Sequence, residues 1–522
     1  MPLSQGRSGY EHAGALAEPE NSSFMRIVSR IAILAVGAAT LSGAGAPQNA
    51  AASFPAYPAL EIGTNAPINL STAPISGSVT QVIEAEPAAQ DSRAEINADS
   101  QQTADRVRQE FLFAWNAYKQ YAWGQDELLP LSKSYKDWYG VSLYMTPVDA
   151  LDTMILMGLK PQADEDRELI ATKLSFDQDI SVKNFEITIR LLGGLLSSYQ
   201  LTGDKRLLAL AQDLGNRLLP VFNSPTGMPY VFVNLKTGAV RDPNTNPAEV
   251  GTLLIEFGAL SKLTHNPVYY DKAKRAMVEL YNRRSKIGLV GSEINIETGA
   301  WINTSSNVSG GIDSYYEYLL KSWLLFGDKD CKRMWDSSLK ALNTYVADER
   351  ATGLWYGTVD MNTGKRLATH WGALDAFFAG TLMLAGDRSR AVELEDSSYR
   401  MWNIAGIEPE EIDYSTLTIT APDYPLRPEV IESAYYLHYF TKDPQYLDMG
   451  HTFLDGLVKY CKTDAGYAAL RDVQTKEKED NMESFFLAET LKYLYLIFAP
   501  HDTINLKDTV FNTEAHPIHR TW

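Results

Sequence analysis

Several carboxylates of this chain lie in segments too apolar to be ordinary solvated surface. In NFEITIRLLGGLLSSY (184–199), Glu186 and Arg190 are four residues apart on one side of a helical pattern. Asp313 follows two glycines and opens another helical pattern, and Glu429 and Glu432 lie three apart just after a proline that favours a first helical turn. Acids carried by the starts of separate helices can meet in one cavity and do chemistry together.

Each of these residues also has a purely structural interpretation. Glu186 and Arg190 could form an ordinary surface ion pair. Asp313 could cap a helix, and Glu429 and Glu432 could simply stabilise the helix dipole in a first turn. Taken one at a time, the residues leave both interpretations open.

Two later segments add polar groups to the same picture. Glu483 and Glu489 interrupt the apolar pattern of NMESFFLAETLKYLYL (481–496), and FNTEAHP (511–517) carries Thr513 and Glu514. A cavity of acids, arginines and aromatic rings suits carbohydrate, because carboxylates bind hydroxyls and rings stack on sugars. Two carboxyl groups flanking a glycosidic bond can divide the labour, one protonating the departing oxygen and the other activating water or attacking.

Repeated turns indicate the elements that position these residues. Five similar segments have last residues 56 to 62 positions apart: LTGD (201–204), LTHN (263–266), LFGD (325–328), LAGD (384–387) and FTKD (440–443). A repeat of this length holds two helices that must share a core with their neighbours. β-prone runs at 227–234, 288–295, 353–360 and 466–473 predict short hairpins or loops between helices. We therefore predict an all-α toroid of helical hairpins around a central cavity.

Composition limits the partners of the chain. Of its 522 residues 45% are hydrophobic, enough for one large toroid, and its net charge is −18. Lysine and arginine are not clustered, so we expect no nucleic-acid partner. An acidic cavity would suit a cation or a neutral polyol. We expect a monomer.

The N-terminal part carries a predicted export signal. Met25 opens a short basic region, an apolar stretch runs over residues 31–41, and small residues then offer cleavage sites. We divide the chain into an extension with signal peptide or anchor (1–52), a linker or loosely ordered arm (53–100) and a catalytic domain (101–522). The expected location is periplasmic or secreted; if the signal is retained, the protein is membrane-anchored in the secretory pathway.

The two cysteines leave a choice open. Cys331 and Cys461 both lie in predicted helices, and they could pair in an oxidising compartment or be buried as separate thiols. The chain has no CxxC pattern or His/Cys cluster that would indicate zinc.

From about residue 104 to its end, the chain resembles glycoside hydrolase family 47, the class I α-1,2-mannosidases. Six ordered blocks carry the resemblance: TPVDALDTMILMGL (146–159), NFEITIRLLGGLLSSYQLTGD (184–204), GIDSYYEYLLKSW (311–323), LRPEVIES (426–433), MESFFLAETLKYLYL (482–496) and VFNTEAHP (510–517). The resemblance implies an (α/α)7 toroid plugged by a β-hairpin, a Ca²⁺ ion at the cavity floor, and hydrolysis with inversion.

The resemblance also implies roles for individual residues. Glu186 matches the proposed general acid, acting directly or through water, and Glu429 matches the usual general base, with Asp313 as the third catalytic carboxylate. Thr513 matches the residue that binds Ca²⁺ through its hydroxyl and carbonyl oxygens. The residues that match positions holding the terminal mannose or the water shell of the ion are Arg190, Arg427, Glu432, Phe485 and Glu489, with Phe485 beneath the sugar.

The chain departs from the family pattern in its outer cleft. A His-Leu pair of many members reads Ala373-Leu374, the usual disulfide cysteine falls at Ala376, and a substrate-contacting arginine falls at Gly311. The stretch LDAFFAG (374–380) is similar to the ER degradation-enhancing mannosidase-like subgroup, while the missing disulfide would suit a bacterial relative. These changes affect branch specificity more than the floor of the cavity.

The expected function is therefore exo-acting hydrolysis of terminal α-1,2-linked mannose, with Ca²⁺ as cofactor and a high-mannose glycan or related α-1,2-mannoside as substrate. An alternative is a lectin-like member that binds mannose glycans with little turnover. A third interpretation is another toroid enzyme, such as an epimerase or an unsaturated-uronyl hydrolase. The FNTEAHP block argues against it, because those toroids have no equivalent segment.

Overall fold

The computed structural model describes residues 87–522, with side chains from Asp99 onward. The predicted signal lies outside the described residues. The first described helix, α2 (Pro87–Tyr121), begins inside the segment that was expected to be a loosely ordered arm. The three-part division of the chain otherwise stays a prediction.

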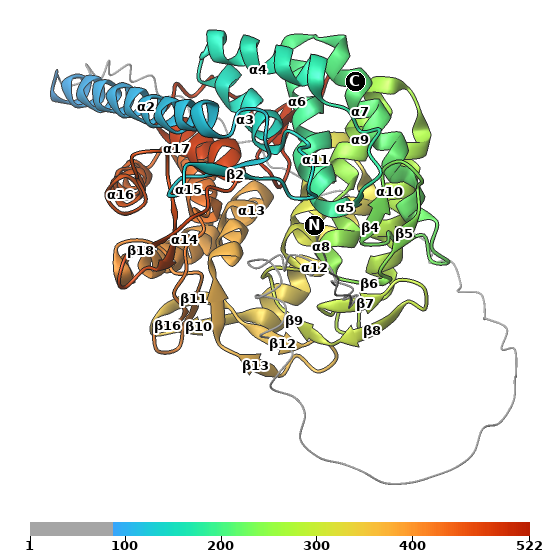
Figure 1. The fold of residues 1–522 in the computed structure, drawn as a ribbon. Coiled ribbons are helices and arrows are strands. Elements are labelled where there is room, and N and C mark those ends of the chain that lie inside the picture. The colour runs from blue at the N-terminus through green and yellow to red at the C-terminus, as the bar shows by residue number, and fades with distance from the viewer. Residues whose placement is uncertain (1–86) are drawn as a thin grey trace, which may run out of the picture. The chain divides into compact units, whose positions relative to one another are not determined.

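Within the described residues, the main helices form an inner and an outer ring of seven, which confirms the predicted (α/α)7 toroid (Figure 1). The inner ring closes because α3 packs against α6 on one side and against the segment leading into α17 on the other. The inner helices are α3 (Met145–Leu156), α6 (Gly193–Thr202), α9 (Leu254–Thr264), α11 (Asp313–Phe326), α13 (Phe377–Ala385), α15 (Glu429–Thr441) and α17 (Leu491–Phe498). The outer helices are α2, α4 (Lys160–Lys173), α7 (Lys205–Leu218), α10 (Pro267–Asn282), α12 (Lys329–Ala341), α14 (Arg388–Ala405) and α16 (Gln445–Tyr460).

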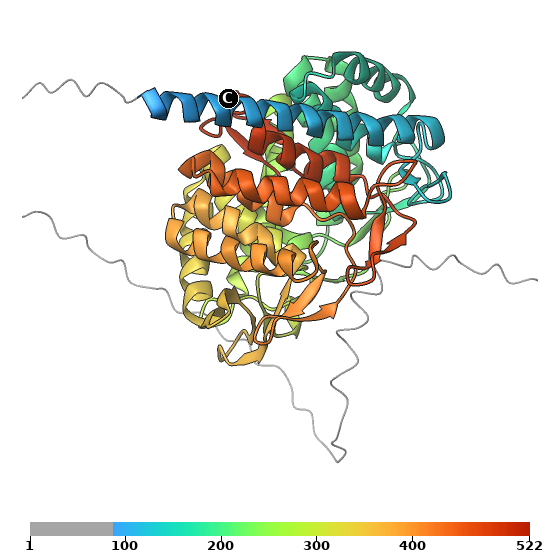
Figure 2. The ribbon, with the colours of Figure 1, turned by 90° about the vertical axis from the view of Figure 1, so that its left-hand side faces the viewer.

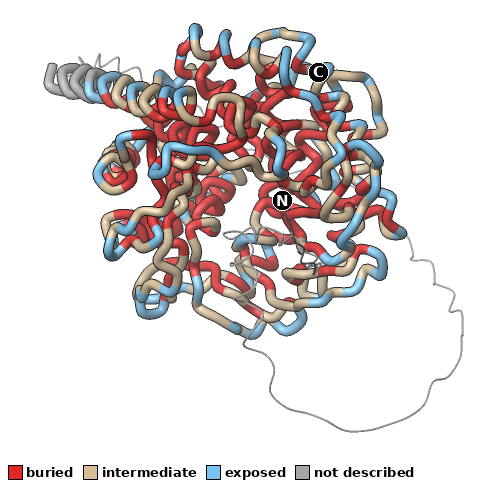
Figure 3. Tube along the Cα trace, viewed as in Figure 1, coloured by how far each residue is buried: buried red, intermediate tan, exposed pale blue. Residues whose placement is uncertain are grey.

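The two rings differ in how their side chains are patterned. The inner helix α13 reads FFAGTLMLA and is buried from Phe377 to Met383, as expected of a helix covered on all sides. The outer helix α7 buries a stripe that includes Leu207, Ala211 and Leu214 and exposes its opposite face. Burial therefore concentrates inside the rings, and exposed residues gather on the outer faces and connections (Figure 3). Figure 2 shows the last helices of the chain lying side by side.

The five repeated turns join inner helices to outer ones, as predicted. At these five turns the inner helix ends at a residue with positive φ: Gly203, His265, Gly327, Gly386 and Lys442. The side chains of Asp204, Asn266 and Asp328 then accept backbone N–H groups of the next helix. Asp387 occupies the same position without a capping bond. The repeated segment is thus a tight turn in which a left-handed residue ends one helix and an Asp or Asn precedes the next.

Short antiparallel strands connect outer helices to the next inner helices. The predicted β-prone runs are confirmed, since each contains at least one strand. Four sheets have three strands: β3 (Ser181–Lys183), β4 (Phe232–Asn234) and β5 (Val240–Arg241); β6 (Asn244–Thr245), β7 (Glu293–Asn295) and β8 (Ala300–Asn303); β13 (Arg366–Ala368), β12 (Thr358–Asp360) and β9 (Ser305–Ser306); β14 (His370–Gly372), β15 (Glu411–Asp413) and β16 (Thr418–Ala421). Four have two: β1 (Glu127–Leu129) with β2 (Ser134–Lys136), β10 (Ala347–Arg350) with β11 (Gly353–Tyr356), β17 (Ala469–Asp472) with β18 (Glu477–Glu479), and β19 (Thr509–Phe511) with β20 (Pro517–His519).

The last hairpin, β19–β20, packs against the inner helices α6 and α11. Its turn is anchored by the buried Asn512, whose amide donates to the Ile189 carbonyl and to Glu256, both at 2.8 Å. A Cβ at Gly193 would lie 2.6 Å from the Asn512 amide nitrogen, so the glycine allows this close approach. The hairpin thereby fixes the position of Thr513.

Cys331 and Cys461 are both buried free thiols, so the two cysteines do not pair. Among the described helices, we find none with the length and apolar character needed to cross a bilayer.

Candidate active site

The predicted site residues lie at the N-terminal ends of four inner helical segments and on the β19–β20 turn. Glu186 lies in α5 (Asn184–Ile187), and Arg190 lies in the π-helical turn η1 (Thr188–Leu192) that leads into α6. Asp313 is the first residue of α11, and Glu429 is the first residue of α15. Phe485 and Glu489 belong to the segment entering α17, where Phe485 directly precedes the π-helical turn η5 (Phe486–Thr490).

Glu186 and Arg190 form a buried pair. Arg190 Nε donates to Glu186 Oε2 at 3.2 Å, and the two residues are 5% and 6% exposed. The same guanidinium contacts the carboxylate of Glu514 and the hydroxyl of Ser484. The interpretation as a surface ion pair therefore does not apply, because this arginine is surrounded by buried acceptors.

Two guanidinium groups lie close to the ring of Phe485. The Cζ atoms of Arg190 and Arg427 are 5.6 and 5.8 Å from its centroid. Glu410 holds Arg427 through two bonds, 3.0 Å to Nε and 2.7 Å to Nη2. An apolar ring face is thus framed by fixed cations, an arrangement that can bind a hydroxylated ring.

Asp313 and Glu429 are carboxyl groups in low-dielectric surroundings. Burial raises the pKa of Asp313 to about 7, although the Ser314 N–H donates to its carboxylate at 2.7 Å. Burial raises the pKa of Glu429 to about 8, against the opposing charge of Arg427. Glu429 Oε2 is buried and finds no hydrogen-bond partner among the described residues. Both groups are therefore suited to proton transfer near neutral pH.

Glu432 and Glu489 add further buried negative charge beside Glu429. Burial raises the pKa of Glu432 to about 7, although Lys321 Nζ lies 3.6 Å away. Burial, together with Glu514, Glu429 and Glu432, raises the pKa of Glu489 well above its ordinary value. The site thus concentrates carboxyl groups that repel one another when ionised.

Thr513 lies at the turn of the β19–β20 hairpin, where its backbone N–H donates to the Tyr318 hydroxyl at 3.3 Å. Its neighbour Glu514 binds Arg190 and repels Glu489, so the turn belongs to the same cluster. Among residues 99–522 we find no group of three or more Cys, His, Asp or Glu side chains placed to hold a metal ion by themselves. Ca²⁺ nevertheless accepts hydroxyl, carbonyl and water oxygens. A cation at Thr513 would also offset the mutual repulsion of the carboxylates, so the residues fit Ca²⁺.

Sequence reasoning missed several residues of this cluster. Asp149 is fully buried, accepts a hydrogen bond from the Ser484 hydroxyl and lies 3.5 Å from Arg190. Its neighbour Asp152 pairs with Lys492 at 2.7 Å and with His516 at 2.7 Å. Two acids three residues apart in the apolar stretch TPVDALDTM were a signal that could have been followed.

Unusual backbone conformations occur around the site. Leu426 has φ 69° just before Arg427, and Ala515 has φ 57° in the hairpin turn. Such left-handed residues cost about 1–3 kcal/mol each and are often found at functional sites. Gly311, where the family pattern has an arginine, has φ 88°, so a side chain would be strained in this backbone.

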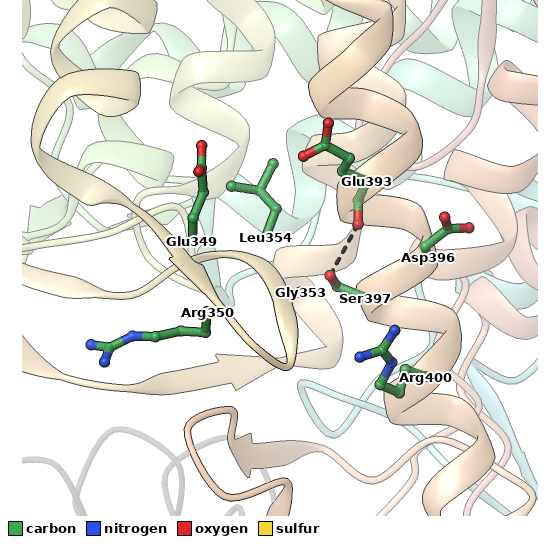
Figure 4. A pocket seen from close by; sticks show the side chains of 8 residues that line it. All are labelled: Glu349, Arg350, Gly353, Leu354, Glu393, Asp396, Ser397 and Arg400. Atoms are coloured by element: carbon green, nitrogen blue, oxygen red, sulfur yellow. Dashed lines mark hydrogen bonds between the residues drawn. The ribbon is translucent and has the colours of Figure 1, made fainter.

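A separate hollow lies between the β10–β11 hairpin and α14 (Figure 4). Its volume is about 310 Å³, and it shares no residue with the cluster described above. Its walls carry charged side chains such as Glu349, Glu393 and Arg400, and Ser397 donates to the Glu393 carbonyl at 3.0 Å. None of the predicted catalytic, substrate-binding or metal-binding residues lines this hollow.

The (α/α)7 toroid carries several buried carboxyl groups at one end of its inner helices, an arrangement that suits the hydrolysis of glycosides. The family model for glycosyl hydrolase family 47 matches residues 110–520, so the chain belongs to this family. The predicted resemblance is thereby confirmed.

Individual relatives agree with this assignment. The chain is 38% identical over 459 residues to alpha-mannosidase I MNS5 of Arabidopsis thaliana, covering 82% of this chain and 79% of that protein. It is 36% identical over 449 residues to ER degradation-enhancing alpha-mannosidase-like protein 2 of Mus musculus, covering 79% and 77%. Among solved structures it is similar to the alpha-1,2-mannosidase from Trichoderma reesei, with a TM-score of 0.74, 29% identity, and coverage of 80% of this chain and 99% of that one.

Proposed function

We propose that this protein is an exo-acting α-1,2-mannosidase that removes terminal mannose with inversion of configuration and depends on Ca²⁺. The observation that carries the proposal is that two arginines near the ring of Phe485 connect the three acids: Arg190 is bonded to Glu186, and the charge of Arg427 acts on both Asp313 and Glu429. The names of the relatives support the mannoside substrate.

In this mechanism Glu186 protonates the departing glycosidic oxygen, directly or through a water molecule. Glu429, assisted by Asp313, takes a proton from the water that attacks the anomeric carbon from the opposite face. Room for that water requires carboxyl groups about 6.5–9.5 Å apart. Phe485 supports the sugar ring, while Arg190, Arg427, Glu432 and Glu489 orient hydroxyl groups.

Ca²⁺ bound at Thr513 would grip vicinal hydroxyls and favour distortion of the sugar ring. The protein's own residues supply the remaining chemistry. Burial raises the pKa of Glu429 to about 8, yet a base must be ionised. A positive charge near Glu432 and Glu489 would lower the pKa of Glu429 and so favour its ionised form, which can act as the base.

We further propose export to the periplasm or the outside, action as a monomer, and a high-mannose glycan or related α-1,2-mannoside as the natural substrate. The chain has Ala373 and Gly311 where the family pattern has larger polar residues, which supports a branch preference different from that of members carrying those residues.

The direct test is release of mannose from α-1,2-linked mannobiose with and without a chelator. We expect release by the untreated protein, loss after complete Ca²⁺ removal, and recovery when Ca²⁺ is restored. NMR of the first product should show the inverted anomer. Release that survives complete Ca²⁺ removal would contradict the role of the metal, and retention of configuration would contradict the mechanism.

Glu429→Gln separates an enzyme from a lectin-like binder. The substitution keeps the shape of the side chain but removes its ability to accept a proton, so the turnover rate should fall by roughly 10²–10⁴-fold. Affinity for mannobiose, measured by calorimetry, should change much less. Folded wild-type protein that binds mannobiose without releasing mannose would favour the lectin-like alternative.

A further inference from the structure

A lysine outside the predicted machinery lies beside the proposed acid. Lys183 ends strand β3, three residues before Glu186. Its Nζ is 3.8 Å from Glu186 Oε1 and 2.9 Å from Glu249 Oε1. The side chains of Lys183, Glu249 and Glu186 are 22%, 11% and 6% exposed, so water screens the three charges only weakly.

Glu249 is held in place from both sides. It lies in the short helix α8 (Pro247–Gly251), where its N–H donates to Asn246 Oδ1 at 2.9 Å. The Thr245 hydroxyl donates to Glu249 Oε2 at 2.7 Å, which leaves Oε1 directed at Lys183. The lysine is fixed in turn, because its backbone N–H donates to the Tyr139 hydroxyl at 3.2 Å.

The other groups facing Glu186 are already committed. Arg190 donates to Glu186 but also binds Glu514 and approaches Asp149. Tyr139 and Glu514 also interact electrostatically with Glu186. Lys183 is therefore a second cation next to the proposed acid, and Glu249 shares its ammonium group with Glu186.

We propose that Lys183 and Glu249 form a positioning pair that sets the charge state of Glu186. Lys183 favours the ionised carboxylate, and Glu249 limits this effect by pairing with the same ammonium group. This inference rests on the proposed function, because it assigns the pair a role in proton transfer by Glu186.

The two halves of the pair should act in opposite directions. In Lys183→Gln the cation is gone, so the pKa of Glu186 rises, and the limb of the kcat/KM–pH profile that reports Glu186 should move up by about 1 pH unit. In Glu249→Gln one carboxylate that shares the lysine with Glu186 becomes neutral, so the same limb should move down by about 1 pH unit. Lys183→Arg keeps the positive charge and should restore a profile close to that of the wild type.

A matched control is Lys236→Gln, which removes an exposed lysine at the turn after β4 and should leave the profile unchanged. Shifts of the same sign in Lys183→Gln and Glu249→Gln, or no shift in either, would overturn the proposal. A purely structural role would lower activity at every pH without moving the limb.

A second measurement does not depend on turnover. The Glu186 carboxyl can be titrated by ¹³C NMR after selective glutamate labelling, with Glu186→Gln for assignment. The expected order of pKa is Lys183→Gln above wild type above Glu249→Gln. If the wild type releases no mannose but shows this order, the proposed function fails and the charge pairing stands. If mannose is released and the order is absent, the pairing fails alone.

Discussion

Two acids behind Glu429 are buried without any partner. Glu395 in α14 and Glu408 after it are both fully buried, and both oxygens of each lack a hydrogen bond among the described residues. Burial raises the pKa of both groups, and the neighbouring carboxylates of Glu429, Glu410 and Glu395 add to the effect for Glu408. An ionised carboxylate there would be costly, so burial favours the protonated form of each group in the folded protein.

This burial makes the stability of the protein depend on pH. Above its ordinary pKa, Glu408 ionises in the unfolded chain, whereas burial favours its protonated form in the folded one, so the free energy of unfolding falls as pH rises. Glu408→Gln removes this penalty. We expect the variant to gain about 1–2 kcal/mol at pH 8 and to match the wild type near pH 4.5, measured by urea unfolding at both values.

Glu411→Gln is the matched control on the adjacent strand. The bonds of Glu411 to His370 and Thr420 hold its pKa below the ordinary value despite partial burial. Neutralising this carboxylate should therefore bring no gain at pH 8. A Glu408→Gln variant with the same pH slope as the wild type would show that Glu408 is ionised in the folded state.

At the scale of elements, the sequence was most informative where local chemistry decides. The turns such as LTGD were predictable because a left-handed residue followed by Asp or Asn ends one helix and caps the next. The all-α toroid and its short hairpins followed from the spacing of these turns. The helix α2 begins further toward the N-terminus than expected. Its first residues carry no sustained apolar pattern, so the sequence did not indicate a helix there.

The π-helical turns could not be predicted. The turn η1 begins two residues after Glu186 and carries Arg190, and η5 begins directly after Phe485 and carries Glu489. A π-helical turn depends on tertiary packing that no local periodicity records. It shifts the register of the inner helix, which explains why a regular helical pattern could not show which side chains meet.

The site residues themselves show the same division. Glu186, Asp313 and Glu429 could be named because they interrupt apolar runs and match the family blocks. Glu410 and Glu249 could not, because each looks like a surface acid in sequence and gains its role from a partner elsewhere in the chain, Arg427 or Lys183. Long-range ion pairs leave no local pattern.

At the scale of the whole molecule, the last hairpin joins parts of the ring that are distant in sequence. The side-chain amide of Asn512 donates to the Ile189 carbonyl in η1 and to Glu256 in α9. Its side-chain oxygen Oδ1 accepts the backbone N–H groups of Glu514 and His516. Lys492 in α17 donates to the Ala515 carbonyl at 2.6 Å. These bonds tie the hairpin, and with it Thr513, to η1, α9 and α17.

Asn512→Ala should consequently weaken both the fold and the calcium response. The substitution leaves buried donors and acceptors unpaired, so we expect a loss of roughly 2–4 kcal/mol in the free energy of unfolding. Because Thr513 is the next residue, the rise in Tm on adding Ca²⁺ should also shrink. Urea unfolding and calorimetry with and without Ca²⁺ measure the two effects.

Thr509→Ala provides the comparison within the same hairpin. Thr509 is also buried, but its hydroxyl bonds reach only the nearby Asp508 and His519, so its removal should cost about 1 kcal/mol and leave the calcium response intact. Equal losses in the two variants would mean that the hairpin is held mainly by its apolar packing. A larger loss confined to Asn512→Ala would identify its amide as a link between the β19–β20 hairpin and the inner helices, because Asn512 bonds to Ile189 and Glu256, whereas Thr509 bonds only to residues near it in the hairpin.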